Sequence, residues 1–219
     1  MPDDAKPLDG RRARRERGRV AVIDAMFSLL QDGKVPVSAE MVAERAGVSV
    51  ASVFRYFDGL DDLQVQTVER FRDRFAPVLA GDVDPATPRR QRIEAFVADR
   101  IDLYEQAGAI MAVGRLRALE HDPLVAAAAH MRGLFTDQTR RTFGVDVAGE
   151  APSRVADLIA VVDALTSLEA WDVMRRSHAR SRAQITQTWQ HGIGALIDAW
   201  IADSHRCAER RTDEGDNVE

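Results

Sequence analysis

The sequence predicts an all-α protein made of two helical regions. Apolar residues recur at spacings of three and four over most of the chain, and capping residues, glycines and prolines separate these stretches. No stretch alternates apolar and polar residues in the way that a half-buried strand would. The chain has 219 residues, 45% of them hydrophobic, which is enough to bury a substantial core.

The N-terminal region is expected to begin with a basic arm and a first helix. Residues 1–16 are expected to be a disordered basic N-terminal arm, because they are polar and contain two prolines. Apolar residues from Val20 to Leu30 recur every three or four positions and predict a helix over about residues 17–31.

Two short helices joined by a tight turn are predicted next. Ser38 is a favoured N-cap residue, and Gly47 favours the left-handed conformation that ends a helix, which predicts a helix over residues 39–46. Ser49 would cap a third helix over residues 50–57. Together the two helices form a helix-turn-helix. One apolar cluster would fix the angle between them: Val42, Ala46, Val48, Val53 and Phe57.

The first domain is expected to span residues 17–60, and the rest of the chain is expected to be helical too. A fourth helix over residues 60–79 would make residues 61–80 a connection between the two regions. Residues 81–205 are expected to form one helical domain, and residues 206–219 a disordered tail. Within that domain, helices are predicted over residues 88–106, 122–143, 152–177 and 181–204, with an irregular helix between Gly108 and Gly114.

The most informative motif lies at residues 46–57. It consists of a small residue, Gly-Val-Ser, three variable residues, a hydrophobic residue, an aromatic, Arg, an aromatic and Phe (AGVSVASVFRYF). With this motif and the helix before it, residues 18–70 resemble TetR-family transcriptional regulators. After residue 80 the resemblance is limited to the order of the helices. The resemblance implies an N-terminal three-helix helix-turn-helix DNA-binding domain and a C-terminal helical ligand-binding and dimerisation domain.

The function that the resemblance implies is sequence-specific regulation of transcription. The chain would be a repressor that a mainly apolar small molecule releases from its operator. Its partners would be double-stranded operator DNA, a second copy of the chain in a homodimer, and that small-molecule effector.

The resemblance and the charge distribution together indicate which residues meet DNA. The residues that open the third helix would reach base edges in the major groove, and the hydroxyl of Tyr56 would contact a phosphate. The formal net charge is −5, yet the six arginines from Arg11 to Arg19 are opposed only by Glu16. This arm would contact the DNA backbone or enter the adjacent minor groove. The expected DNA-binding residues are Ser38, Ser49, Val50, Ala51, Ser52, Arg55 and Tyr56, with Arg12, Arg14 and Arg15 from the arm.

The resemblance also implies a pocket and a subunit interface in the second region. The last two predicted helices are apolar over more than one face, and such a helix needs more than one partner surface. The expected interface residues are Leu158, Val162, Leu165, Ile193, Leu196, Ile197 and Trp200. The expected pocket residues are Leu103, Tyr104, Met111, Met131, Phe135, Trp171 and Met174.

Three departures from the family pattern leave a second interpretation open. Phe54 stands where many members have a phosphate-binding tyrosine, and Leu60 stands where a lysine often opens the fourth helix. Glu40 replaces a residue that is basic in some members. The alternative is therefore a helical protein-interaction module with a degenerate DNA-binding motif.

The sequence does not favour an enzyme, a metal site or a cofactor. The five histidines show no spacing typical of metal ligands, and no nucleophile elbow or phosphate-binding glycine loop is present. The single cysteine, Cys207, excludes an internal disulfide. Apolar runs are too short to cross a bilayer, so we expect a cytoplasmic protein without a membrane partner.

Overall fold

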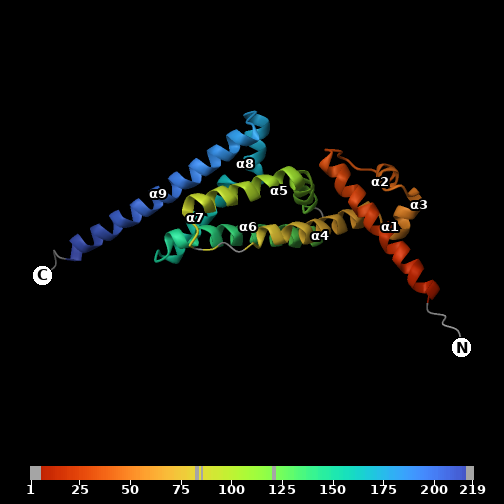
Figure 1. The fold of residues 1–219 in the computed structure, drawn as a ribbon, viewed down its shortest axis with the longest axis horizontal. Helices are drawn as coiled ribbons and strands as arrows, with labels where there is room; N and C mark the ends of the chain where they lie inside the picture. Colours follow the sequence, from red (N-terminus) through yellow and green to blue (C-terminus); the bar gives the residue numbers. More distant parts are fainter. Residues whose placement is uncertain (1–5, 82–83, 85, 120–121, 216–219) are drawn as a thin grey trace. The chain divides into compact units, whose positions relative to one another are not determined.

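The computed structural model describes residues 6–81, 84, 86–119 and 122–215, and these residues form helices and connecting turns without a strand (Figure 1). The all-α prediction is therefore confirmed. The elements are α1 (Lys6–Gln31), α2 (Ala39–Ala46), α3 (Val50–Tyr56), α4 (Leu60–Leu79), α5 (Arg89–Arg117), α6 (Asp122–Phe143), a 3₁₀ turn η1 (Gly144–Val147), α7 (Pro152–Leu165), α8 (Leu168–Asp172), a π-helical turn η2 (Val173–Ser177) and α9 (Arg182–Gly215).

The chain divides into two compact units whose boundaries differ from the expected ones. The first contains the described residues of Met1–Phe75 and Gln106–Met131, and the second those of Ala76–Glu105 and Arg132–Glu219. The expected domain over residues 81–205 coincides with neither unit, because residues 106–131 belong to the first unit.

The helix α5 is continuous across this boundary, where the sequence predicted an interruption between Gly108 and Gly114. Gly114 serves packing instead. A Cβ there would lie 3.7 Å from Cγ2 of Val68, so the missing side chain lets α5 approach α4 closely.

The first unit has a core built mainly by α1, α2 and α3, which contact one another. Val22 and Met26 of α1 are fully buried, as is Val42 of α2. Ion pairs surround this core: Arg45 of α2 binds Asp32 at 2.8 Å, and Arg70 of α4 binds Asp24 of α1 at 2.9 Å. Burial of apolar side chains is the main force that fixes the three helices against one another, since exposed ion pairs contribute little.

The second unit is built around α7 and α9, which pack closely. Gly192 permits this approach, because Cδ2 of Leu165 lies only 3.4 Å from the position that a Cβ would take. Four predicted interface residues, Leu158, Val162, Ile193 and Ile197, have no exposed surface within the single chain. They pack in the core of their own subunit, and the chain as described presents none of their surface to a partner. The other three, Leu165, Leu196 and Trp200, are half-buried.

The two chain ends are more helical than the sequence predicted. The helix α1 begins at Lys6, and α9 continues to Gly215, so the described parts of the expected disordered arm and tail are helical. Arginine, alanine and glutamate are all strong helix formers, and they need no apolar period to form a helix. The remaining residues of the arm and tail, 1–5 and 216–219, lie outside the described part of the chain.

The helix predicted over residues 152–177 is broken. The helix α7 ends at Leu165, where the Thr166 hydroxyl donates to the carbonyl of Val162 at 2.8 Å. Ser167 then caps α8, accepting a hydrogen bond from the amide of Ala170 at 3.1 Å. Serine and threonine offer the backbone such alternative hydrogen bonds, which is why they favour helix ends. None of the described helices is long and apolar enough to span a membrane.

Candidate nucleic-acid interface

The turn between α2 and α3 is fixed by local hydrogen bonds. The Ser38 hydroxyl accepts from the amide of Met41 at 3.3 Å, and the Ser49 hydroxyl accepts from the amide of Ser52 at 3.2 Å. Between the helices, Gly47 has a φ of 66°, which is the left-handed region that glycine adopts without strain. The predicted caps and helix end are all confirmed, and they set the entry angle of α3.

One face of α3 is buried and the other is open to solvent. Val53 and the following Phe57 are only 1% and 2% exposed, and they anchor the helix on α1 and α2. On the opposite face, Ala51 and Arg55 are exposed. Val50, Ser52 and Tyr56 are half-buried, so each still presents surface. The structure thus brings together the α3 residues that the sequence predicted at the interface.

A chain of polar contacts holds the open face in place. The Arg55 guanidinium donates to the Ser52 hydroxyl at 3.0 Å, and the hydroxyls of Ser52 and Ser49 are 3.0 Å apart. These contacts orient Ser52, the polar side chain at the start of α3 that suits hydrogen bonding to a base edge.

The N-terminal half of α1 supplies positive charge beside α3. Arg12, Arg14, Arg15 and Arg17 are exposed, and no carboxylate of the described residues lies within ion-pair distance of them. Arg15 reaches the backbone carbonyl of Arg55 at 3.5 Å, so the basic stretch lies next to α3. These guanidinium groups therefore remain available for phosphates.

The basic stretch is helical, where a disordered arm was expected. An α-helix with its side chains is about 10–12 Å wide, whereas the minor groove is about 6 Å wide. The helix as a whole is too wide for that groove, so only its arginine side chains could reach into the groove or contact the sugar-phosphate backbone.

Tyr56 and Gly18 form a contact that the sequence did not reveal. A Cβ at Gly18 would lie 2.6 Å from the hydroxyl oxygen of Tyr56 and 2.9 Å from Cζ. The Tyr56 ring thus lies directly on α1, with the Arg55 guanidinium 5.3 Å from its centre. The hydroxyl has no hydrogen-bond partner among the described residues. It is therefore positioned by α1 and free to bind a phosphate oxygen.

A negative charge stands at the start of α2. The backbone amide of Glu40 and the hydroxyl of Ser38 lower the pKa of the Glu40 carboxyl below its ordinary value of 4.5. Glu40 is therefore ionised at neutral pH, and its charge opposes phosphate binding at this helix.

Phe54 of α3 is 54% exposed and offers only apolar contact, such as with a thymine methyl group.

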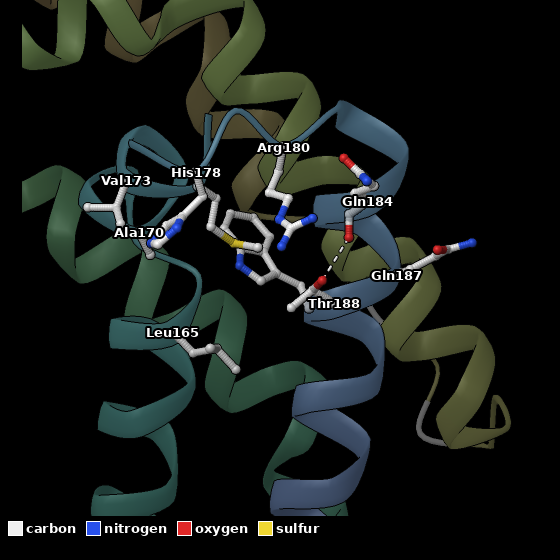
Figure 2. A pocket seen from close by; sticks show the side chains of 10 residues that line it. Leu165, Ala170, Val173, His178, Arg180, Gln184, Gln187 and Thr188 are labelled. Atoms are coloured by element: carbon white, nitrogen blue, oxygen red, sulfur yellow. Dashed lines mark hydrogen bonds between the residues drawn. The ribbon is translucent and has the colours of Figure 1, made fainter. Parts of the chain in front are cut away.

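The predicted pocket residues lie in several different surroundings: Met174 lines one cavity, and Tyr104 and Trp171 line another. Met111 and Met131 lie in the first unit, whereas the other five lie in the second. Tyr104, Phe135 and Trp171 belong to an aromatic cluster in which Tyr104 has ring-centre distances of 6.2 Å to Phe135 and 6.4 Å to Trp171. Leu103 is 1% exposed and is plain core. Met174 does line a cavity, which has a volume of about 640 Å³ (Figure 2). Within the described residues, no group of His, Cys, Asp or Glu side chains could hold a metal ion.

Comparison with known proteins identifies the fold that this arrangement of helices shares. Neither a protein-family profile nor a curated protein matches the chain. A TetR-family transcriptional regulator from Streptomyces coelicolor superposes with a TM-score of 0.71, at 19% sequence identity over 90% of this chain and 88% of that one. The chain has the TetR fold.

Other solved structures share the TetR fold. A TetR transcription regulator from Haloarcula marismortui is similar with a TM-score of 0.58, at 15% identity over 83% of this chain and 97% of that one. The multidrug-binding protein EbrR, solved with imidazole, is similar with a TM-score of 0.51, at 20% identity over 90% of this chain and 94% of that one. The TetR fold accounts for the helix-turn-helix at the N-terminal end and for the helices that follow it.

Proposed function

We propose that the protein is a sequence-specific DNA-binding transcriptional regulator, a repressor that a mainly apolar small molecule releases from its operator. The observation that carries this proposal is the juxtaposition of the open face of α3 with unpaired arginines on α1. The regulators that share the fold support it, as does the multidrug-binding protein among them. Because its target would be chromosomal DNA, the proposed place of action is the cytoplasm.

In the proposed complex, α3 lies in the major groove. Val50, Ala51 and Ser52 face the base edges, with Ser52 as the hydrogen-bonding side chain and the other two limited to apolar contacts. Tyr56 and the α1 arginines bind phosphates, which fixes the position of α3 but carries no sequence information. Ser38 and Ser49 act by capping α2 and α3, which places their hydroxyls at the helix ends that approach DNA.

The proposed assembly is a homodimer. Val161 of α7 is 43% exposed, and the half-buried Leu165, Leu196 and Trp200 leave further apolar surface on α7 and α9. Pairing of this surface with a second copy would remove it from water. It would also supply the two recognition helices that read half-sites about 34–36 Å apart, or a multiple of that distance.

The experiment that tests DNA binding starts from selection of duplexes from a random-sequence library, followed by affinity measurements at two salt concentrations. Ser52→Ala should cost about 1–3 kcal/mol on the selected sequence and relax the preference at one base position. Arg15→Gln should instead weaken binding to all sequences and reduce the salt dependence by the equivalent of about one phosphate contact.

Arg90→Gln is the matched control, because its side chain is 90% exposed on α5 and far from α3 in the sequence. It should change neither the affinity nor the salt dependence. Failure to enrich any sequence, with the protein folded, would contradict the proposal. That result would favour the alternative of a protein-interaction module, for which the exposed Phe54 would be a contact residue.

A further inference from the structure

The segment that connects α8 to α9 has an unusual backbone and an unusual charge. After the π-helical turn Val173–Ser177, Ala179 has a φ of 50°, a left-handed conformation that is strained for alanine. The amide of Arg180 donates to the carbonyl of Met174 at 2.9 Å, and the Arg175 guanidinium donates to the carbonyl of Arg180 at 3.1 Å. π-Turns and strained backbone occur often at functional sites. Here the two hydrogen bonds hold the backbone of Arg180.

A cavity of about 640 Å³ lies beneath this segment, between α8 and α9 (Figure 2). Its volume is typical of sites for small molecules, which span about 300–1,000 Å³. The apolar part of its lining consists of Leu165, Ala170, Val173, Met174 and Trp189. The polar part consists of His178, Arg180, Gln184, Gln187 and Thr188, all of them exposed to solvent.

The charge of the lining is positive. None of the ten lining residues is acidic. In the same segment, Arg176 is paired with Asp172, and Arg182 with Asp102 and Glu105. No carboxylate of the described residues lies within ion-pair distance of Arg180, whose guanidinium points toward the middle of the cavity in Figure 2. Arg180 is therefore the arginine of the cavity lining, and no carboxylate of the described residues neutralises it.

The apolar wall carries an unsatisfied donor as well. Trp189 has no exposed surface, and its indole N–H has no hydrogen-bond partner among the described residues. A buried donor without a partner is costly. In the cavity lining, the Arg180 guanidinium is a donor only, so it favours an acceptor group on the ligand.

We propose that this cavity binds an amphiphilic carboxylate, with an aliphatic or aromatic body against the apolar wall and the carboxylate on Arg180. Arginine binds carboxylates through two parallel hydrogen bonds, which makes it the residue best suited to this recognition. The body of the ligand covers Val173 and Met174, and Gln184 and Thr188 stand beside the headgroup. This ligand would be the effector of the proposed regulator, and that part of the inference rests on the proposed function.

The test is a calorimetric titration of the DNA-free protein with decanoate and with decan-1-ol, both below their aggregation concentrations. Decanoate should bind at least about tenfold more tightly than the alcohol, because only the anion forms charge-assisted hydrogen bonds with Arg180. Arg180→Gln should weaken decanoate binding about tenfold and leave the binding of decan-1-ol unchanged.

Two further variants separate charge from volume. Arg176→Gln is the matched control, since it removes a charge from the same segment but not from the cavity lining, and it should leave decanoate binding unchanged. Ala170→Leu adds apolar volume at the wall and should weaken both ligands. Circular dichroism spectra would confirm that each variant keeps its helices.

The inference is overturned if decanoate does not bind, if the alcohol binds as tightly as the acid, or if Arg176→Gln weakens binding as much as Arg180→Gln. These outcomes are independent of DNA binding. A protein that selects DNA but binds no carboxylate would refute this inference and keep the proposed function. A protein that binds decanoate through Arg180 but selects no DNA would support this inference and refute the proposed function.

Discussion

At the level of single residues, Gly18 links α1 to the phosphate-binding side of α3. We expect Gly18→Ala to leave the protein folded, because alanine favours a helix by about 1 kcal/mol over glycine and offsets local strain. The new methyl group would displace the Tyr56 ring, whose hydroxyl lies 2.6 Å from the Cβ position. DNA affinity should therefore fall about tenfold, the loss of one hydrogen bond to a charged group. Thermal unfolding and fluorescence anisotropy measure the two effects separately.

Gly10→Ala provides the control for this substitution. Gly10 lies in the same helix, but nothing lies within 4 Å of the position that its Cβ would take. The variant should bind DNA as the unmodified protein does. Equal affinity of the Gly18→Ala variant and the unmodified protein would show that the position of Tyr56 is unimportant for binding.

The same residues show what the sequence could predict at this scale. Ser38, Gly47 and Ser49 were correctly assigned, because a cap depends on a residue and its next three neighbours. The contact between Gly18 and Tyr56 depends on how two helices pack, and glycine in a helix has no local signature of that contact. For the same reason, no pattern revealed that Arg15 lies beside α3.

At the level of elements, a buried ion pair fastens α5 to η1. Arg92 and Asp146 are joined by contacts of 2.7 Å and 2.9 Å, and both side chains are 5% exposed. Asp146→Ala should lower the free energy of unfolding by about 3–5 kcal/mol, because it leaves the buried Arg92 charge without a carboxylate and with only the carbonyls of Thr87 and Thr142 as acceptors. Chemical denaturation measures this loss.

Asp198→Ala tests whether burial of the ion pair is the reason for the large expected loss of unfolding free energy. Asp198 also binds an arginine, Arg89, at 2.7 Å, but its side chain is 73% exposed. Its removal should cost no more than about 1 kcal/mol, as expected for an exposed pair. Comparable losses in the two variants would mean that burial of the Arg92 pair does not determine its contribution.

Elements were predicted well where caps or prolines mark them and less well where they do not. The bounds of α4 and α6 were close to those expected, because Gly59 and Pro123 lie next to their first residues. The end of α7 at Leu165 was missed, because the chain beyond it continues with apolar residues at helical spacing. Periodicity cannot show a break of two residues between two helices that bury the same side.

At the level of the whole molecule, the proposed homodimer makes a prediction about mass. The unmodified protein should have twice the chain mass of 24.3 kDa in light scattering at micromolar concentration. Val161→Glu would place a charge on the exposed face of α7, and burial of an unpaired charge is costly, so this variant should be monomeric.

Val125→Glu is the control for the dimer, because Val125 is 46% exposed on α6, close to the 43% of Val161. It should remain dimeric. A monomeric mass of the unmodified protein would contradict the proposed assembly, and dissociation of both variants would mean that α7 is not specifically involved.

The apolar pattern of the last helices did not separate core residues from residues that could meet a partner. A row of apolar residues along a helix indicates that the helix is buried, but it does not show whether the covering surface belongs to the same chain. Leu158 and Ile193 were assigned to a partner for that reason, although they fill the core of their own subunit. The all-α class was predictable because it depends on periodicity, which is a property of each segment alone.

The helical start of α1 has a consequence for how fast the protein would find DNA. A disordered arm must become ordered during binding, and that step slows the formation of a stable complex. In α1, the guanidinium groups of Arg12, Arg14 and Arg15 are already carried by a helix before the encounter. The association rate would then be governed by diffusion and by long-range attraction to the phosphates. A single kinetic phase that slows steeply as salt is added is the behaviour that this rigid basic helix implies.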